Sequence, residues 1–166
     1  MKKSAFVIGG IVMMSWFGSL LAAEGIDEKK SFTVDGMKGV HTELDSQNLS
    51  VTPVEGDTVT VRLHGESVRE VRLAAEIVDG ILVVGVQRSG KMPIYEKLAM
   101  EISLPAASTK RLSLTTESRS GNVELGSLEL ASYSHEGSSG RCNAPHLSSH
   151  LLNLFLSVLP RAHVAE

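Results

Sequence analysis

The amino-acid sequence predicts an all-β protein: a right-handed β-roll or β-solenoid-like stack of short strands, preceded by a hairpin-rich N-terminal part. Three observations carry this prediction. Apolar and polar residues alternate in several short segments, an Asp-Gly pair separates two β-rich runs, and a Ser-Gly-centred pattern at residues 120–128 recurs at 139–147. The composition agrees, because 42% of the 166 residues are apolar but only 4% are aromatic. A core of Val, Leu, Ile and Ala favours strands with small, regular side-chain layers.

Residues 1–23 have the order of a secretory signal peptide, with a basic start, an apolar middle and small residues at the end. Lys2 and Lys3 precede an uncharged run that ends at Ala23. We expect cleavage after Ala23 and export to the periplasm, the outer envelope or the cell surface. The alternative is an uncleaved membrane anchor, because the length of the uncharged run approaches the ~20 residues that a spanning helix needs. Contact with a membrane is therefore expected only through this segment, if it stays uncleaved.

Removal of residues 1–23 changes the composition of the remaining chain. It takes away two lysines and no acidic residue, so the net charge of −3 becomes more negative, and it takes away the only Trp. The acidic balance argues against nucleic-acid binding, and the lack of Trp argues against sugar recognition by aromatic stacking. A single Cys cannot form an internal disulfide, which excludes a disulfide scaffold.

A polar linker is expected at residues 24–30, followed by short strands. The first strands are expected at residues 32–34, 40–44 and 49–54. The segment 59–63 then alternates strictly. Because side chains of a strand point alternately to its two faces, this pattern places Val59, Val61 and Leu63 inward and Thr60 and Arg62 outward.

Residues 71–78 and 81–86 are β-rich runs on either side of Asp79 and Gly80. Asp-Gly between such runs is the strongest short-range signal of a hairpin, because both turn residues need a positive φ. A helix over residues 67–78 is the competing interpretation. The segment 98–104 alternates again, and it predicts an inward face formed by Leu98, Met100, Ile102 and Leu104.

A repeat follows Pro105. Residues 120–128 align with residues 139–147, with Val123 matching Cys142 and Leu128 matching Leu147. Each copy is typical of a strand, a Ser-Gly turn and a second strand. Inward-facing apolar residues at such a period indicate stacked β-rungs, each burying its inner face against its neighbours. Two ordinary Ser-Gly hairpins in a β-sandwich are the alternative.

The order of these segments resembles a bacterial family. The motifs Val-x-Val-x-Leu63, Asp79-Gly-Ile-Leu-Val-Val and Leu98-x-Met-x-Ile-x-Leu-Pro are followed by Ser-Gly turns at Gly121 and Gly140. The pattern looks like the β-strand-repeat domain of unknown function labelled putative adhesin, which is similar to auto-transporter head and toastrack domains, over residues 31–147. The resemblance implies an extracytoplasmic β-roll or β-solenoid associated with the cell envelope, and it brings no family catalytic residues with it.

The C-terminal tail, residues 148–166, departs from this pattern. Residues 151–159 are nearly all apolar and lack the alternation of a strand. One interpretation is a short helix that caps the open end of the stack and prevents edge-to-edge pairing. The other is a truncated or frame-altered end, which would leave an apolar edge exposed.

For each candidate catalytic or metal-binding residue, a structural role explains the sequence better than a chemical role does. Cys142, His146 and His150 have the spacing of a metal site on a helix, but Pro145 interrupts a helix there. His135 lies near Ser138 and Ser139, without the Gly-x-Ser-x-Gly motif of a nucleophile elbow. We therefore expect no metal, no cofactor and no enzymatic activity. Paired carboxylates of a glycosidase are the alternative, and the candidates are Glu117, Glu124, Glu129 and Glu136.

The residues that flank the Ser-Gly turns are expected to lie in register on successive units and to form a polar strip. This candidate interaction face consists of Thr115, Thr116, Glu117, Arg119, Ser134, His135 and Glu136. The sequence therefore predicts a non-enzymatic structural or adhesion-type interaction module of the cell envelope. Its expected partner is a protein or glycan of the envelope or surface, and self-association through the ends of the stack is a further expectation. A glycan-processing or glycan-binding protein that uses acidic residues on the β-stack is the alternative function.

Overall fold

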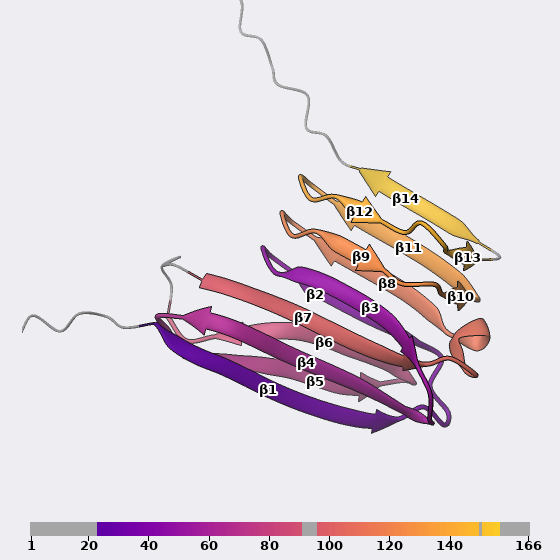
Figure 1. Ribbon diagram of the computed structural model, residues 1–166, viewed down its shortest axis with the longest axis horizontal. Coiled ribbons are helices and arrows are strands. Elements are labelled where there is room, and N and C mark those ends of the chain that lie inside the picture. The colour runs from indigo at the N-terminus through magenta and orange to yellow at the C-terminus, as the bar shows by residue number, and fades with distance from the viewer. Residues whose placement is uncertain (1–22, 91–95, 150, 157–166) are drawn as a thin grey trace, which may run out of the picture.

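The computed structural model describes residues 23–90, 96–149 and 151–156 (Figure 1). Strands stack in two facing layers, and each layer is a six-stranded sheet. A separate two-stranded sheet and one 3₁₀ turn at Thr109–Arg111 complete the described structure. The described ranges contain no α-helix, so the all-β prediction is confirmed. No helix in these ranges has the length and apolar character to cross a membrane.

The first sheet contains both antiparallel and parallel pairs. In spatial order its strands are β1 (Glu24–Thr33), β4 (Thr58–Ser67), β7 (Glu96–Pro105), β3 (Asn48–Val54), β9 (Val123–Leu125) and β12 (Cys142–Asn143). The pairs β1–β4 and β4–β7 are antiparallel, and the remaining pairs are parallel.

The second sheet faces the first. In spatial order its strands are β14 (Leu152–Leu156), β11 (Ser132–Gly137), β8 (Ser113–Ser118), β2 (Gly39–Leu44), β6 (Ile81–Arg88) and β5 (Val71–Val78). The small third sheet pairs β10 (Glu129–Leu130) with β13 (Ser148–Ser149). Only β5–β6 is antiparallel in the second sheet.

The core lies between the two large sheets, and the strands with strict alternation supply much of it. Val59, Val61 and Leu63 on β4 are completely buried, as their alternation predicts. The four inward residues expected on β7, from Leu98 to Leu104, are buried as well. Burial of these aliphatic side chains is the main favourable contribution to folding.

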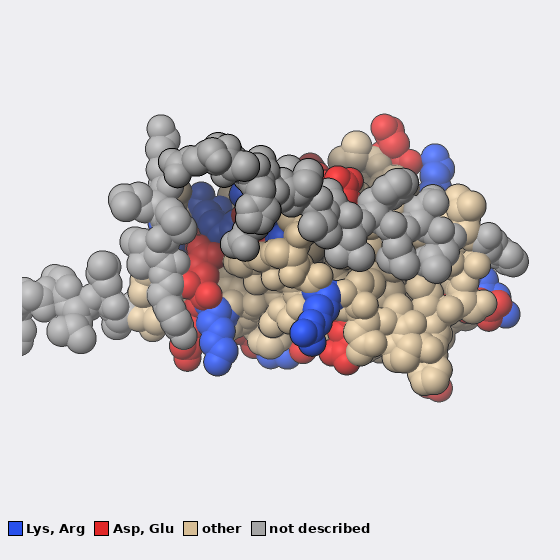
Figure 2. Space-filling view, turned by 90° about the horizontal axis from the view of Figure 1, so that it is seen from above, with Lys and Arg blue, Asp and Glu red and all other residues tan. Residues whose placement is uncertain are grey.

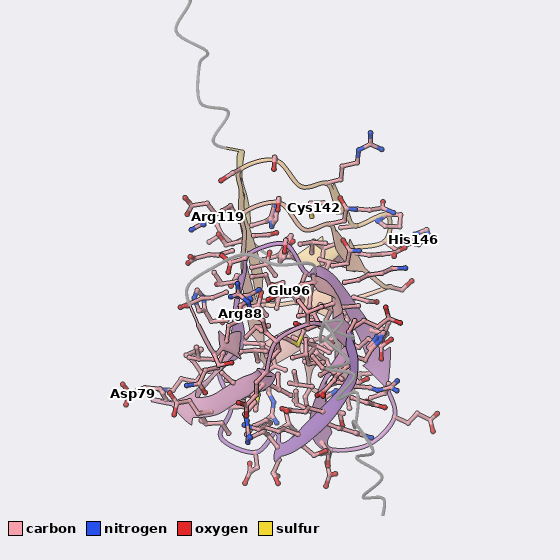
Figure 3. All side chains as sticks on the ribbon, turned by 90° about the vertical axis from the view of Figure 1, so that its left-hand side faces the viewer. Asp79, Arg88, Glu96, Arg119, Cys142 and His146 are labelled. Carbon is pink, nitrogen blue, oxygen red and sulfur yellow. The ribbon has the colours of Figure 1, made fainter. Side chains whose placement is uncertain are left out.

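The predicted hairpin at Asp79 and Gly80 is confirmed. Strands β5 and β6 pair antiparallel from Val71↔Arg88 to Val78↔Ile81. Asp79 and Gly80 both have positive φ, of 53° and 84°, as the two turn residues of such a hairpin require. The competing helix over residues 67–78 is wrong. Figure 3 shows Asp79 at the projecting tip of this hairpin.

Three units of the chain stack on one another, and we call each unit a rung. Rung 1 comprises β2 and β3, rung 2 comprises β8, β9 and β10, and rung 3 comprises β11, β12 and β13. Equivalent strands of rungs 2 and 3 pair in parallel with a constant offset along the chain, as in Ser113↔Ser132 and Val123↔Cys142. The predicted repeat is therefore confirmed. The alternative of two Ser-Gly hairpins is wrong, because β8 and β9 belong to different sheets.

The sequence predicts a hairpin-rich part over residues 31–104, which would include rung 1, and the structure corrects this. Strand β2 pairs with β8 in parallel, Gly39 opposite Ser113, and β3 pairs with β9 in the same sense, Leu49 opposite Val123. Strands β4 to β7 separate rung 1 from rung 2 along the chain but extend the same two sheets in space. The stack therefore begins before the segment 58–105 and resumes after it.

The Ser-Gly turns stack closely on one another. A Cβ atom added to Gly121 would overlap the backbone carbonyl oxygen of Gln47, and one added to Gly140 would overlap that of Gly121. The serine hydroxyl of the second turn donates to the rung below: Ser139 Oγ lies 3.1 Å from the carbonyl oxygen of Arg119. Glycine is thus required by the close approach of successive backbones.

An asparagine ladder accompanies these turns. Asn48 Oδ1 accepts a hydrogen bond of 3.1 Å from the backbone N–H of Asn122. Asn122 Oδ1 accepts one of the same length, 3.1 Å, from the backbone N–H of Arg141. Each side chain satisfies a backbone donor of the next rung, so the ladder fixes the register at the turns.

Both expected boundary segments differ from their prediction. Residues 24–30, expected as a linker, form most of β1, whose polar residues face solvent on an edge strand. Glu28 Oε2 accepts a 2.7 Å hydrogen bond from the N–H of Leu73, an edge group of β5. In the tail, residues 148–149 form β13, and residues 152–156 form β14 in parallel pairing with β11, not a capping helix. Residues 157–166 lie outside the described residues, as do residues 1–22 of the predicted signal segment 1–23.

Candidate functional site

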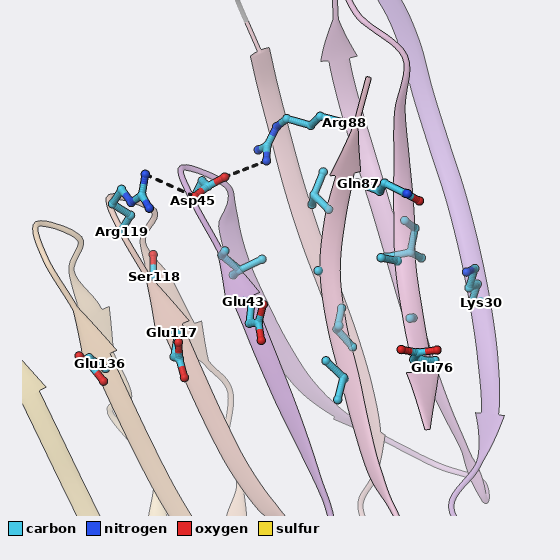
Figure 4. A pocket seen from close by; sticks show the side chains of 18 of the residues that line it. Lys30, Glu43, Asp45, Glu76, Gln87, Arg88, Glu117, Ser118, Arg119 and Glu136 are labelled. Carbon is cyan, nitrogen blue, oxygen red and sulfur yellow. Dashed lines mark hydrogen bonds and ion pairs between the residues drawn. The ribbon is translucent and has the colours of Figure 1, made fainter. Parts of the chain in front are cut away.

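Three glutamates form a row on the outer face of the second sheet. The parallel register places Glu43 of β2, Glu117 of β8 and Glu136 of β11 directly beside one another (Figure 4). All three side chains are exposed. Neighbouring strands lie about 4.8 Å apart, and like charges at directly paired positions destabilise a sheet. We call these three residues the acidic row.

A polar row runs beside the acidic row, two positions earlier on each strand. It consists of His41, Thr115 and Ser134, which the same register aligns. His41 Nε2 lies 3.4 Å from Glu43 Oε1 and 3.6 Å from Glu117 Oε1. Among the described residues, His41 is the only group with a side-chain nitrogen within 4 Å of a carboxylate of the acidic row, and it lies beside Glu43 and Glu117.

A groove of about 860 Å³ borders the acidic row. Its floor contains Gly85 of β6 and Ala74 of β5, which are paired across the hairpin and leave the sheet uncovered. Figure 4 shows Glu76 and Lys30 on the side opposite the acidic row. Small residues of β5 and β6 therefore form the floor of the groove, whereas the strands beside them, β2, β8 and β11, carry carboxylates.

One end of the groove is closed by a charge network. Asp45 lies between two arginines (Figure 4): Arg88 Nη1 is 2.8 Å from Asp45 Oδ2, and Arg119 Nη1 is 3.9 Å from Asp45 Oδ1. Arg88 also donates from Nε to both carboxylate oxygens of Glu96, at 3.0 and 2.9 Å. Asp45 is thus compensated by arginine, whereas the acidic row is not.

Charges are mixed on the visible part of the face that is seen from above. Seen from above, Lys and Arg atoms and Asp and Glu atoms lie scattered among uncharged residues over the part of this face that is not grey (Figure 2). This view shows no large patch of one sign.

The predicted interaction face is divided between the two sides of the sheet. Its register is confirmed, since Thr115 pairs with Ser134 and Glu117 with Glu136. These four residues face outward, and Arg119 is exposed in the turn at the end of the groove. Thr116 and His135 face inward and are 0% and 1% exposed. Including these two was wrong, because consecutive residues of a strand point to opposite faces.

The two inward residues belong to a buried hydrogen-bonded cluster. Thr116 Oγ1 lies 2.8 Å from His135 Nδ1 and 3.3 Å from the hydroxyl of Tyr133, which in turn lies 3.2 Å from Cys142 Sγ. Burial lowers the pKa of His135 and, together with the hydrogen bond to Cys142, raises the pKa of Tyr133. His135 is therefore turned away from the exposed turn of Ser138 and Ser139.

The Cys-His-His spacing does not form a cluster in the described residues. Cys142 lies on a strand, is partly buried and contacts the Tyr133 hydroxyl. His146 is exposed at the outer edge of the stack (Figure 3), and His150 lies outside the described residues. Within the described part of the chain, no three His, Cys, Asp or Glu residues are grouped as metal ligands.

The short-period repeat in the sequence does not reveal the contribution of rung 1 to this face. Glu43, His41 and Asp45 all come from rung 1 or its turn. The signal was present, because residues 39–51 align with 113–125, with Asn48 opposite Asn122 in the ladder. The inserted strands β4 to β7 separate the two copies too widely for a short-period repeat to be evident.

Comparison with known proteins relates the chain to adhesin-like structures only distantly. No family model and no curated protein matches the sequence. A putative cell adhesion protein from Clostridium sporogenes is 12% identical, with a TM-score of 0.49 over 70% of this chain and 59% of that chain. A putative adhesin from Bacteroides fragilis is 12% identical, with a TM-score of 0.43 over 78% of this chain and 75% of that chain.

A third solved structure, a putative adhesin from Parabacteroides merdae, is 12% identical, with a TM-score of 0.34 over 77% of this chain and 76% of that chain. The chain spans 59% of the length of the Clostridium protein that it matches.

Proposed function

We propose that the chain is an exported, non-enzymatic interaction module of the adhesion type, which binds a protein or glycan of the envelope or cell surface. The acidic row carries this proposal. Glu43, Glu117 and Glu136 stand side by side on parallel strands, next to a groove of about 860 Å³. No Lys or Arg among the described residues forms an ion pair with them, and His41 lies beside Glu43 and Glu117.

The chemistry of this face suits a ligand that donates hydrogen bonds or carries positive charge. Adjacent carboxylates repel one another in the free protein, so a partner that supplies hydroxyl, amine or guanidinium donors relieves that repulsion. The neighbouring polar row adds acceptors and donors from Thr115 and Ser134. An extended ligand lying across the three strands would contact both rows and the groove.

The candidate catalytic residues support a non-enzymatic role. The hydroxyl of Ser139 donates to a backbone carbonyl of the turn below. His135 points into the core and hydrogen-bonds Thr116. A general base must reach the proton that it abstracts, and His135 is separated from the outer face by its own sheet.

Binding is expected to depend on the acidic row. The full chain is applied to a glycan array and to immobilised surface fractions of bacterial cells, and a bound component is titrated. Glu117→Arg and Glu136→Arg are each expected to weaken its affinity by about tenfold or more, which corresponds to roughly 1.4 kcal/mol. The matched control is Glu124→Arg, which changes an exposed glutamate of β9 on the other sheet. Equal affinities for all variants, or no binding by the wild type, would contradict the proposal.

A glycan-processing enzyme is the second candidate, and the adjacency of carboxylates beside a groove favours it. Glycosidases use a pair of carboxyl groups that flank the scissile bond. Incubation of bound glycans with the full chain distinguishes the two candidate functions. Shortened glycans whose release is abolished in Glu117→Gln would indicate the enzyme, and recovery of intact glycans supports the binding module.

We also propose that the rungs form a right-handed β-roll or β-solenoid-like stack. The constant offset between the paired strands of rungs 2 and 3 supports this proposal. The hydrogen bonds of the asparagine ladder support it further. In such a stack each rung gains its stability from its nearest neighbours.

Export is expected to remove residues 1–23 and to leave Glu24 as the first residue. Glu24 is the first residue of β1 and pairs with Ser67, so cleavage after Ala23 leaves this strand complete. Intact-mass spectrometry of the protein from fractionated bacteria checks the prediction, and a species beginning at Glu24 outside the cytoplasm is the expected result. A 17.8 kDa species retained in the membrane fraction would instead indicate the uncleaved anchor.

A further inference from the structure

His135 differs from the two other histidines that lie on strands of the sheets. His41 and His64 face carboxylates: His41 Nε2 lies 3.4 Å from Glu43, and His64 Nε2 lies 3.3 Å from Glu101. His135 is 1% exposed, and its Nδ1 shares a 2.8 Å hydrogen bond with Thr116. The Nε2 atoms of His135 and His64 are both buried without a hydrogen-bond partner among the described residues, but only that of His64 lies beside a carboxylate.

The elements packed around His135 offer no counter-charge. On its own strand the nearest inward side chain is Tyr133, from β8 comes Thr116, and from β12 comes Cys142. The exposed Arg141 lines the same pocket as His135, and its positive charge would repel an imidazolium and not neutralise it. The sequence of β14 contains no titratable residue. Glu117 and Glu136 lie on the outer face of the same sheet. An imidazolium at this position would be a buried, unpaired charge, which is strongly unfavourable.

We propose that His135 makes the C-terminal part of the stack acid-labile: below neutral pH, β11 to β14 separate from rung 2 while the sheets of β1 to β7 stay folded. Rung 3 lies beyond rung 2 in both sheets, so it borders the stack on one side only through β8, β9 and β10. In a stacked array stability is a sum of nearest-neighbour terms. The destabilisation is therefore expected to be local, and it does not depend on the proposed function.

The direction of the pH effect follows from the buried state. Burial lowers the pKa of His135 below its usual value of 6.5, so the folded rung keeps the ring neutral. In the opened rung, the ring of His135 takes up a proton below that value. The stability of the folded rung is therefore complete above pH 6.5 and decreases as the pH falls below 6.5. Uptake of one proton raises the opening constant by up to about eightfold between pH 7.0 and pH 5.5.

Amide hydrogen exchange of the full chain tests this proposal, with rates corrected for the intrinsic effect of pH. Exchange in residues 132–149 and 151–156 is expected to accelerate several-fold from pH 7.0 to pH 5.5, while β4 and β7 remain protected. His135→Gln, which cannot take up the proton, is expected to remove this acceleration even if it lowers stability at both pH values. His135→Leu is a second variant without a titratable group, and His41→Gln is the control that keeps the acceleration.

Two results would overturn the proposal. One is the same acceleration in wild type and in both His135 variants, which would assign the effect to other groups. The other is equal acceleration in β4, β7 and β11, which would show unfolding of the whole protein in place of local opening of the C-terminal rungs.

Discussion

Gly121→Ala is expected to destabilise the protein by about 3 kcal/mol, the upper part of the range for overpacked interiors. The added Cβ would overlap the carbonyl oxygen of Gln47 in the turn of rung 1. The obstructing atom belongs to the backbone, so relief requires rungs 1 and 2 to move apart. Such a movement would also lengthen the hydrogen bond between Asn48 and the N–H of Asn122, which is 3.1 Å long.

Urea unfolding followed by circular dichroism measures this effect. The matched control is Gly25→Ala, because a Cβ added to Gly25 has no atom within 4 Å and the residue has no positive φ. The control is expected to change the free energy of unfolding by less than about 0.5 kcal/mol. If the two alanine variants have the same midpoint, the close stacking of the turns is contradicted.

Leu63→Ala is expected to cost about 3 kcal/mol, because it removes a completely buried side chain from an interior strand of the first sheet. Strand β4 lies between β1 and β7, so the neighbouring strands hold the cavity open and prevent a full collapse around it. The loss therefore includes both the transfer of apolar atoms and the cavity that remains.

The comparison variant for Leu63 is Thr60→Ala on the same strand. Thr60 is only partly buried, and its hydroxyl makes a single long contact of 3.5 Å with Ser31. Its replacement is expected to change stability by about 0.5 kcal/mol or less. A larger loss for Thr60 than for Leu63 would reverse the inward and outward faces of β4 and contradict the fold.

The parts of the fold that follow from local patterns could be predicted from the sequence. Alternation on β4 and β7 identifies their inward faces, because side chains on a strand alternate between its two faces. Asp79 and Gly80 identify the hairpin, because few residue pairs tolerate positive φ at both turn positions. The repeat that links rungs 2 and 3 identifies their parallel register, because both copies are adjacent in the chain.

The parts that depend on distant pairing could not be predicted in this way. The polar segment 24–30 has little apolar alternation, and it becomes a strand because β4 offers it an edge. Rung 1 is separated from rung 2 by four strands, so its match to residues 113–125 has no local signal. The tail lacks alternation, yet β11 offers the edge on which β14 forms.

The candidate site, too, could be predicted from the sequence only in part. The repeat correctly aligned Glu117 with Glu136 and Thr115 with Ser134. It did not separate the outward residues from Thr116 and His135, because a repeat fixes the register of residues and not the face to which each side chain points. The third carboxylate, Glu43, was missed together with rung 1.

Nuclear Overhauser contacts in the isotope-labelled protein report on the stacking of the rungs. Backbone contacts are expected between equivalent residues of rungs 2 and 3, such as Glu117 with Glu136 and Val123 with Cys142. Contacts are also expected between Glu43 and Glu117, which belong to rungs 1 and 2. Antiparallel contacts between residues 113–118 and 123–125, the pattern of an ordinary Ser-Gly hairpin, would contradict the stack.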